Sequence, residues 1–405
     1  MKKGTKAKKA LKTAIKWSII VISVLLVFAF VIMMIGGMFV SPDYLNPWDK
    51  QNHKIVRDPR LQLLAIGILA PNAHNMQHWK FKLDDQDDKV FYLYANPERI
   101  VSQDPTHREM MISCGTLLEY VNIAAKKQNF GVEIELFPNG QIDEENFEKS
   151  IETVPVAKVT LNDDVNLERL ELYDKMFIQE TNRYVYIKTP ISKAEKELYY
   201  SLNDFEDLSI KFLTDEEALK NISELTLKGL DITHKVPRLA QQTKKDTRMT
   251  EYQKNKKSYG VSLETQGIKN AFVKYALQGT LTVMPFLGSN KNMAKVTQKT
   301  YKKLYGSTGT FMVLVCPVAK MNDRITQVNC GRLYSRLVLT GHTIKMGFHP
   351  MSALIADYEE AVQIKGEFMT KYLSADEYPF MTTRVGLITK QFPKSMRQNV
   401  LDFVK

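Results

Sequence analysis

The feature that most constrains this chain is an uninterrupted apolar run near its N-terminus. The 24 residues from Trp17 to Val40 read WSIIVISVLLVFAFVIMMIGGMFV and contain no charged side chain. As an α-helix rising about 1.5 Å per residue, the run would span roughly 36 Å, which is enough to cross a hydrocarbon core of about 30 Å with some tilt. The run therefore predicts one transmembrane helix over residues 17–40.

The charges on either side of the run predict its orientation. Asp43, Asp49 and Lys50 follow it, whereas seven lysines and no acidic residue precede it: Lys2, Lys3, Lys6, Lys8, Lys9, Lys12 and Lys16. This bias indicates a cytoplasmic tail over residues 1–16 and a single-pass protein of the cell membrane, with everything after Ser41 outside the cytoplasm. The alternative is a cleaved signal peptide, but the run exceeds the usual apolar region of about 7–15 residues and lacks an A-x-A-like exit.

The net charge of the chain after residue 16 argues against nucleic acid as a partner. The formal net charge is +11, of which seven charges belong to the tail, so the rest of the chain carries only +4. A nucleic-acid-binding protein is expected to keep its basic excess on the folded part, whereas lysines beside an anchor meet anionic lipid. We therefore expect membrane lipid, and no nucleic acid, as a partner. A second basic cluster, residues 244–257, is interpreted as a solvated surface loop.

The cysteines indicate neither a disulfide framework nor a metal site. Cys114, Cys316 and Cys330 are odd in number and show no C-x-x-C spacing. A zinc site or a set of paired bridges would require a different arrangement. We therefore expect no structural metal.

Two segments of the chain align without gaps. Residues 112–137 read ISCGTLLEYVNIAAKKQNFGVEIELF and residues 328–353 read VNCGRLYSRLVLTGHTIKMGFHPMSA. The alignment superposes Cys114 on Cys330, Gly115 on Gly331, Leu117 on Leu333 and Gly131 on Gly347. Each segment is predicted to form a helix that Ser113 or Asn329 caps at its start and a glycine closes at its end. The paired small residues favour two helices that pack closely on each other across a pseudo-twofold axis.

The rest of the chain alternates between strand and helix patterns. A helical face is expected within residues 58–70, and strands are expected at 79–83, 89–95, 132–137, 156–161, 209–213, 310–316 and 380–388. Further helices are expected from Val165, Ser192 and Asp215, through Phe272 and Val296, and over 358–372. These patterns predict an α+β protein with a linker at 41–56, two similar halves at 57–178 and 179–390, and a C-terminal tail at 391–405. Residues 237–260 are polar and long enough to form a lid.

Several common catalytic motifs are missing from the sequence. No G-x-G-x-x-G follows a predicted strand, and GxxxxGK[ST], H-E-x-x-H and G-x-S-x-G are absent. A Rossmann dinucleotide site is therefore disfavoured, and no signature of a P-loop, a zinc protease or a nucleophile elbow is present.

The most distinctive polar segment is residues 68–83, ILAPNAHNMQHWKFKL. The side chains of Asn75 and Gln77 each carry one acceptor and two donors, and their spacing on an extended loop lets both face one direction. Such a pair suits the edge of a flat heterocycle such as a flavin. The alternative is a polar loop whose amides cap nearby backbone groups.

Five segments, in chain order, resemble one family. Residues 70–81, APNAHNMQHWKF, resemble the AP-S-x-H-N-x-Q-P-W-x-F segment of nitroreductase-like flavoproteins. The segments DPTHREMMISCG, ETNRYVY, CGRLYSRLVLTGHTIKMGFHPMS and PFMTTRVG resemble elements of the branch in which two copies are fused in one polypeptide, the Acg type. The resemblance implies a nitroreductase-like fold in two tandem copies that form a pseudo-dimer within one chain, an arrangement compatible with a monomer.

The resemblance also implies one FMN between the halves. It assigns the flavin ring and ribityl side to Pro71, Asn72, His74, Asn75 and Gln77. It assigns the phosphate to Arg183, with Arg384 as a second ligand, because a phosphate dianion favours a bidentate guanidinium. It directs a backbone N–H of the loop Pro350, Met351 and Ser352 toward the reactive flavin nitrogen. Asn72 and His78 depart from the family's Ser and Pro, which is expected to loosen the loop and weaken binding.

The implied chemistry requires no catalytic side chain, since the flavin itself carries the hydride. His74 and His349 are candidate acids, with ordinary polar contacts as the alternative. The sequence thus predicts a membrane-anchored FMN oxidoreductase that passes electrons from NAD(P)H or another donor to a small-molecule acceptor. Reduced nicotinamide is scarce outside the cytoplasm, so the donor is a quinol or a partner protein unless the topology is inverted. The rival hypotheses are a flavin-storage protein closed by the lid, and an interaction domain without cofactor.

Overall fold

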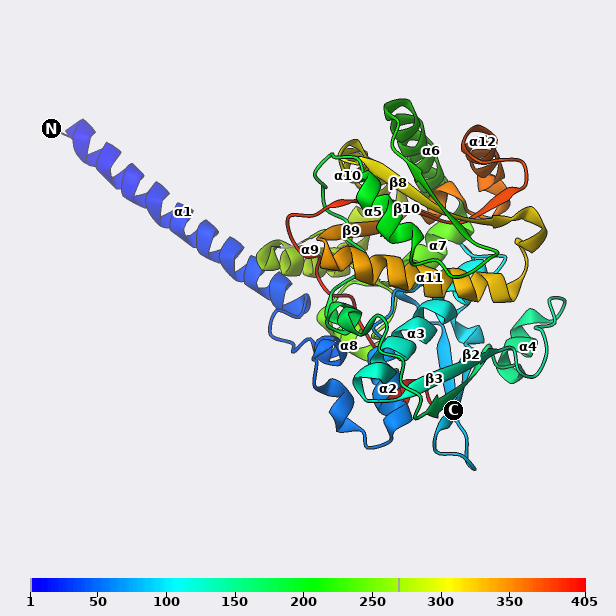
Figure 1. Cartoon of the computed structure of the whole chain (residues 1–405). Coiled ribbons are helices and arrows are strands. Elements are labelled where there is room, and N and C mark those ends of the chain that lie inside the picture. Colours follow the sequence, from blue (N-terminus) through cyan, green and yellow to red (C-terminus); the bar gives the residue numbers. More distant parts are fainter. Residues whose placement is uncertain (1, 269) are drawn as a thin grey trace.

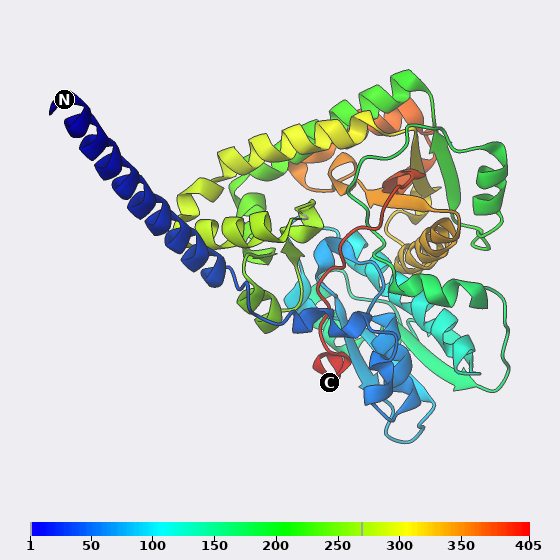
Figure 2. The ribbon, with the colours of Figure 1, turned by 90° about the vertical axis from the view of Figure 1, so that its left-hand side faces the viewer.

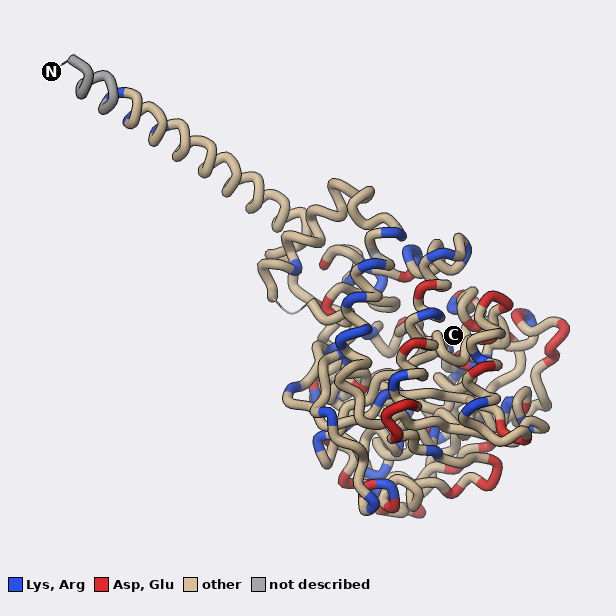
Figure 3. The backbone as a smooth tube through the Cα atoms, turned by 90° about the horizontal axis from the view of Figure 1, so that it is seen from above, with Lys and Arg blue, Asp and Glu red and all other residues tan. Residues whose placement is uncertain are grey.

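The computed structural model describes residues 2–268 and 270–405 and consists of a long helix attached to a body of two sheets (Figure 1). Helix α1, Lys2–Ile35, leaves the body and is exposed along most of its length, with Leu26 65% exposed. It is long and apolar enough to cross a membrane. Helix α1 ends five residues before the predicted boundary, because the chain turns at Gly37, whose φ is 94°. Charged residues of both signs cover the body but not the apolar part of α1 (Figure 3).

The first half of the body is built on a four-stranded antiparallel sheet. Its strands are β1 (Trp79–Leu83), β2 (Val90–Ala95), β3 (Gly131–Leu136) and β4 (Ala157–Asn162), in the order β1-β2-β4-β3. Its helices are α2 (Pro59–Gly67), α3 (Arg108–Lys127) and α4 (Phe147–Thr153). Alternation of apolar and polar residues fixes the faces of the strands, so Trp79 and Phe81 of β1 point into the core with Leu117 of α3.

The second half repeats this order of elements. Its strands are β5 (Ser209–Leu213), β8 (Thr310–Pro317), β9 (Met346–Pro350) and β10 (Glu377–Leu387), in the order β5-β8-β10-β9. Its main helices are α5 (Lys193–Tyr200), α6 (Glu216–Lys235), α10 (Asn290–Gly306), α11 (Arg324–Thr343) and α12 (Val362–Tyr372). In both sheets the strands lie in the order first, second, fourth, third. In both, one long helix joins the second strand to the third.

Those two long helices, α3 and α11, pack on each other in the middle of the body (Figure 1). A Cβ atom added to Gly115 would lie 1.8 Å from the carbonyl oxygen of Val328, and one added to Gly331 would lie 1.9 Å from that of Ile112. Since Ile112 and Val328 are aligned residues, the contact is reciprocal. The prediction that these helices pack closely through their glycines is confirmed.

The predicted helix starts were wrong. Helix α3 begins at Arg108, and α11 begins after Asp323, whose carboxylate accepts a hydrogen bond from the Thr326 N–H. Ser113 and Asn329 therefore lie inside the helices. The aligned residues that located the two helices lie inside them and do not mark where they start.

The predicted helix ends were also wrong. The left-handed residues after the two helices are Asn129, with φ 60°, and Lys345, with φ 61°. Gly131 and Gly347 belong to the strands that follow. Both positions leave no room for a side chain. A Cβ atom added to Gly131 would lie 2.1 Å from its nearest neighbouring atom, and one added to Gly347 would lie 2.3 Å from its nearest.

Each half receives a segment of chain from the other. The connection after the first sheet pairs Thr181 with Phe348 of β9, and the C-terminal tail pairs Val404 with Phe81 of β1. Figure 2 shows the tail, in red, running from the second half down to the first. The connection itself contains a 3-10 helix at Leu170–Phe177 rather than a regular helix from Val165.

The polar segment predicted as a lid is a folded insertion. It contains α7 (Pro237–Asp246), β6 (Thr247–Arg248), α8 (Glu251–Lys256) and β7 (Val261–Ser262), and α9 (Ala271–Val283) follows it. Lys254 is fully buried between the carboxylates of Glu251 and Glu264. The interpretation of residues 244–257 as a loop was therefore wrong, because the segment is folded and an ion-paired lysine is buried in it. Its surface position is confirmed for Lys244, Lys245, Lys256 and Lys257, which are exposed.

Candidate functional site

The polar loop between α2 and β1 has an unusual backbone. His74, Asn75 and Gln77 have φ values of 51°, 54° and 53°, in the left-handed region that non-glycine residues seldom adopt. The Asn72 side chain holds the turn, because its Oδ1 accepts the Gln77 N–H at 2.8 Å and its Nδ2 donates to the Ala70 oxygen at 3.1 Å. Three such residues in one loop are typical of a segment whose shape serves a function.

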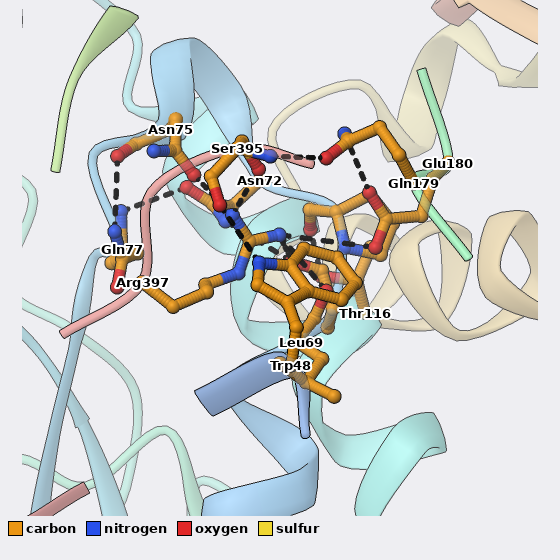
Figure 4. A network of polar contacts seen from close by, with 12 residues as sticks. Trp48, Leu69, Asn72, Asn75, Gln77, Thr116, Gln179, Glu180, Ser395 and Arg397 are labelled. Carbon is orange, nitrogen blue, oxygen red and sulfur yellow. Dashed lines mark hydrogen bonds and ion pairs between the residues drawn. The ribbon is translucent and has the colours of Figure 1, made fainter. Parts of the chain in front are cut away.

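The amide of Asn75 links the loop to two distant segments (Figure 4). Its Nδ2 donates to the carbonyl oxygens of Gly260 and Met396, both at 3.0 Å. Its Oδ1 accepts from Nη1 of Arg397 at 2.6 Å.

The amide of Gln77 makes a parallel set of contacts. The side chain is fully buried, its Nε2 donates to the Ser258 oxygen at 2.8 Å, and its Oε1 accepts the Gln398 N–H at 3.0 Å. The side-chain amides of Asn75 and Gln77 therefore hydrogen-bond to backbone groups, as expected for a polar loop whose amides cap the backbone. These backbone groups are, however, remote in sequence and not nearby. The two amides join the insertion and the C-terminal tail to the loop.

Arg397 lies at the centre of this network. Its guanidinium is buried, and Nη2 donates to the carbonyl oxygens of Leu69 at 2.9 Å and Ala70 at 3.2 Å. Glu180 lies 3.8 Å from it, and burial raises the pKa of Glu180 to about 7 although Arg397 opposes the shift. Sequence analysis missed Arg397, since no motif marks the tail that carries it.

A second group of polar residues lies on β9 and β10. Arg384 is fully buried, and its guanidinium carbon lies 3.7 Å from the centre of the Tyr186 ring. Its Nη2 donates to the Tyr184 carbonyl oxygen, while Nε and Nη1 have no hydrogen-bond partner. Arg183 donates from Nη1 to the Thr265 oxygen at 2.9 Å, and its buried Nε is also unpartnered. Within residues 2–268 and 270–405, neither guanidinium forms an ion pair with a carboxylate.

His349 lies beside this pair of arginines. It is paired with Arg384 in the β9–β10 register, and its Nδ1 has no partner. Burial, and then the charges of Arg384 and Arg183, hold the pKa of His349 well below its ordinary value. The imidazole is therefore neutral at physiological pH and is a poor acid.

A third group gathers around two buried acids at the start of α3. Burial raises the pKa of Glu109, and it raises the pKa of Asp104 to about 7 with a further contribution from Glu109. Nε2 of His74 lies 4.0 Å from Oε2 of Glu109, and the Ser352 hydroxyl hydrogen-bonds to the same carboxyl. The structure thus brings the polar loop and the β9 loop to one carboxyl group. The segment DPTHRE carries both acids, but nothing in the sequence indicates a role for Asp104 or Glu109.

The remaining predicted residues lie around these groups. The carbonyl oxygen of Pro71 accepts a hydrogen bond from the Thr116 hydroxyl at 2.5 Å. The Met351 N–H donates to the Thr382 oxygen at 2.8 Å, and Pro350 has no N–H. Of the three loop residues, Ser352 is left to offer a backbone N–H to a ligand. Burial and Arg183 lower the pKa of His74, whereas Asp246 and Asp104 raise it.

An open cavity of about 410 Å³ lies beside Tyr184, the residue that follows Arg183 in the chain. It is lined by Tyr184, Glu264, Ile268, Ala271 and Lys274 together with residues 390–393 of the tail. Arg384 binds the carbonyl of Tyr184, which connects the cavity to the arginine pair.

No protein-family model matches the chain. A Mycobacterium tuberculosis protein named as an NAD(P)H nitroreductase is 27% identical over 78 residues, which make up 19% of this chain and 22% of that protein. An uncharacterized protein of the same organism is 29% identical over 99 residues, or 24% of this chain and 28% of its own length. The matches thus span less than a third of either relative.

The solved structures that match this chain include nitroreductases with bound FMN. One from Desulfitobacterium hafniense has 8% identity and a TM-score of 0.34, covering 56% of this chain and 94% of its own. One from Bacteroides fragilis has 8% identity and a TM-score of 0.32, covering 56% and 95%. An FMN-dependent nitroreductase from Mycobacterium smegmatis in complex with NADPH has 10% identity and a TM-score of 0.30, covering 54% and 88%.

Proposed function

We propose that the chain is a membrane-anchored, FMN-dependent oxidoreductase built from two nitroreductase-like halves. The observation that carries the proposal is the pair Arg183 and Arg384. Arg384 is fully buried and Arg183 is partly buried, both have buried donors without a partner, and neither has a carboxylate counterion within residues 2–268 and 270–405. Such an arrangement is costly, and an anion would offset that cost. The phosphate of FMN supplies such an anion, with acceptor oxygens that match the guanidinium donors.

The two-copy architecture is supported by the sheets and by the central helices. Both sheets have the same strand order, and both long helices connect the equivalent strands. The reciprocal contacts of Gly115 and Gly331 are those expected of a pseudo-twofold axis between two copies. The sequence similarity to the mycobacterial nitroreductase, 27% over 78 residues, supports the nitroreductase-like part of the proposal and does not bear on the duplication.

The membrane anchor in the proposal is α1. Its apolar side chains remain exposed, whereas a core helix of comparable length would bury them. The seven lysines before residue 17 favour a cytoplasmic N-terminus and a body outside the cytoplasm. On that side a quinol or a partner protein, rather than reduced nicotinamide, is the expected donor.

The residues around the arginine pair fit FMN in defined roles. Arg183 and Arg384 would hold the phosphate, and the unpartnered Nδ1 of His349 is available beside them. Pro71, Asn72 and His74 would approach the flavin from the polar loop, and Ser352 would do so from the β9 loop. Asn75 and Gln77 act through the loop, because their amides fix its shape by binding the insertion and the tail.

Bound FMN would supply the hydride chemistry, since the flavin accepts and donates electron pairs. The chain's own contribution is position and proton supply. Asp104, with a pKa of about 7, can hold a proton at neutral pH next to Glu109 and His74. A buried acid of this kind is typical of a proton donor at an active site.

Flavin storage is the second candidate function, and one observation favours it. The insertion binds the polar loop through Ser258 and Gly260, so it packs against the loop that the proposal places beside the flavin. A permanently covered flavin would be retained without turnover.

The two functions differ in how fast the flavin is reduced. We expect the full-length protein in nanodiscs, loaded with FMN and freed of oxygen, to lose its flavin absorbance within seconds of mixing with a short-chain quinol or with NADPH. Stopped-flow absorbance measures this bleaching, and free FMN at equal concentration is the control. Flavin that stays oxidised for minutes with both donors would reject the oxidoreductase in favour of storage.

A further inference from the structure

We infer that the segment Ala271–Gly288, formed by helix α9 and the 3-10 turn η7 (Pro285–Gly288), is embedded in the outer leaflet of the membrane beside α1. The inference rests on the membrane anchor of the proposed function and goes beyond it. It assigns a second lipid contact, which would fix the body against the bilayer instead of leaving it on a tether.

Helix α9 packs directly on the end of α1. A Cβ atom added to Gly279 would lie 1.8 Å from the carbonyl oxygen of Ile32, and one added to Gly36 would lie 2.5 Å from that of Tyr275. Small residues at a helix crossing allow this approach, as they do between helices in membranes. As residue numbers rise from Tyr275 to Gly279, the contact moves back along α1 from Gly36 to Ile32. The two helices therefore run in opposite directions, and α9 points toward the lipid that surrounds α1.

The contact lies inside the apolar run of α1. Ile32 is three residues before Ile35, where α1 ends, which corresponds to roughly 5 Å at about 1.5 Å per residue of helix. Helix α9 continues for four residues past Gly279 to Val283, or about 6 Å deeper, and η7 follows. The end of α9 thus lies level with residues of α1 that the anchor places in hydrocarbon.

The surface of this segment suits lipid. Phe286 is 69% exposed, and other large apolar side chains on the segment are also exposed: Phe272, Val273, Val283, Met284 and Leu287. Contiguous apolar surfaces of this kind are rare on soluble proteins. Lys274, the one charged residue of the segment, is paired with Glu251 at 2.9 Å and Glu264 at 3.2 Å.

Charged residues flank the segment where lipid headgroups would lie. The helix that follows, α10, carries exposed lysines at Lys291, Lys295 and Lys299. Lysines at this level attract the anionic headgroups of lipids. An apolar segment followed by a basic one favours a membrane over a second protein as the partner.

The junction between α1 and the body is held firmly enough to set an orientation. The Tyr44 hydroxyl donates to Oε2 of Glu251 at 2.7 Å, and Nδ2 of Asn255 donates to the Ser41 oxygen at 2.7 Å. With α9 inserted, the cavity that Ala271 and Lys274 line would open at the membrane surface. A lipid-soluble electron carrier such as a quinone would then reach it without leaving the bilayer.

Lipid contact can be measured on the full-length chain in nanodiscs. The three native cysteines are buried, so a Phe286→Cys variant can be labelled selectively with an environment-sensitive fluorophore. We expect lipids that carry a nitroxide on the acyl chain to quench this label as strongly as one at Leu26→Cys within α1. A label at Val362→Cys, on exposed α12 away from α1, should stay unquenched (Figure 1). Val283→Cys provides an independent second position on the segment.

The outcomes separate this inference from the anchor itself. Quenching at Leu26 without quenching at Phe286 and Val283 would overturn the embedding of α9 and leave the anchor intact. Absence of quenching at Leu26 as well would overturn both. Quenching at all three positions, with Val362 unaffected, supports the inference.

Discussion

At the scale of single residues, Arg384 has the most defined role in the proposal. It is fully buried, it lies across the strand pair from His349, and two of its nitrogen atoms lack partners. Hydrogen bonds to charged groups contribute about 1.5–3 kcal/mol each, which corresponds to roughly a tenfold to a hundredfold change in affinity. We expect Arg384→Met to weaken FMN binding by about that factor and to leave riboflavin binding unchanged, because riboflavin has no phosphate.

Titration of flavin fluorescence with the two ligands measures this difference. Arg384→Lys is the matched control, since it keeps the charge but not the planar fork, and it should fall between the wild type and the methionine variant. Equal losses of FMN and riboflavin affinity in Arg384→Met would place the phosphate elsewhere. The apo methionine variant should be at least as thermally stable as the apo wild type, because it removes an unpaired buried charge.

Asp104 makes a second residue-scale prediction, about pH. Burial and the neighbouring Glu109 raise its pKa to about 7 in the folded protein, against roughly 3.9 in an unfolded chain. Between these values the unfolded chain has released the proton while the folded protein still holds it, so this group makes stability fall as pH rises from about 4 to 7. Asp104→Asn should therefore show a smaller decrease in melting temperature between about pH 5 and about pH 8. An unchanged decrease in this variant would mean that Asp104 is ionised throughout.

At the scale of elements, the crossing of α3 and α11 holds the two halves together. A methyl group at Gly331 would overlap the Ile112 carbonyl oxygen, and backbone atoms cannot give way cheaply. We expect Gly331→Ala to lower the free energy of unfolding by several kcal/mol, at the upper end of roughly 1–3 kcal/mol for overpacking or beyond it. Gly366→Ala in α12 is the control, because a Cβ atom there meets nothing within 4 Å, and it should be neutral or slightly stabilising. Thermal or denaturant unfolding measures both, and equal stability of the two variants would contradict the close crossing.

The elements that sequence predicts best are those with local signals. Ser192 and Asp215 cap α5 and α6 as expected, and the alternating residues of β1 and β2 form strands at the expected positions. Strand β9 was missed because its residues, 346–350, follow a long helix directly and are too few to show a period. Helices α7 and α8 were missed because their segment is mostly polar and shows no apolar period. Part of its burial depends on an ion pair with a residue outside these helices, that of Lys254 with Glu264.

The candidate site also divides into features that local sequence signals indicated and features that depend on residues far away in the chain. The left-handed loop residues lie in a segment that its dense amide composition had marked, and Arg183 and Arg384 lie in segments marked by the resemblance. Nothing local indicated that Asn75 and Gln77 would bind residues near 260 and 396, since those contacts bridge more than 180 residues. Glu109 likewise gains its raised pKa from burial, which only the packed structure specifies.

At the scale of the whole molecule, the insertion connects features that are far apart in sequence. Through Glu251 and Asn255 it holds the base of α1, and through Gly260 it holds the polar loop. Through the Thr265 carbonyl it also contacts Arg183. The membrane anchor and the proposed flavin site are therefore connected through one folded segment.

The proposal places one FMN in a chain of two halves, because the corresponding segment of the second half, residues 201–212 (SLNDFEDLSIKF), lacks the Asn-x-Gln-x-Trp pattern of the Asn75 loop. Purified full-length protein, supplied with FMN and then freed of unbound ligand, should show a flavin spectrum and release one FMN per chain on denaturation. Binding measured by calorimetry should be tighter for FMN than for riboflavin. A colourless protein that binds no FMN at micromolar concentration would contradict the account and leave only the fold and the anchor.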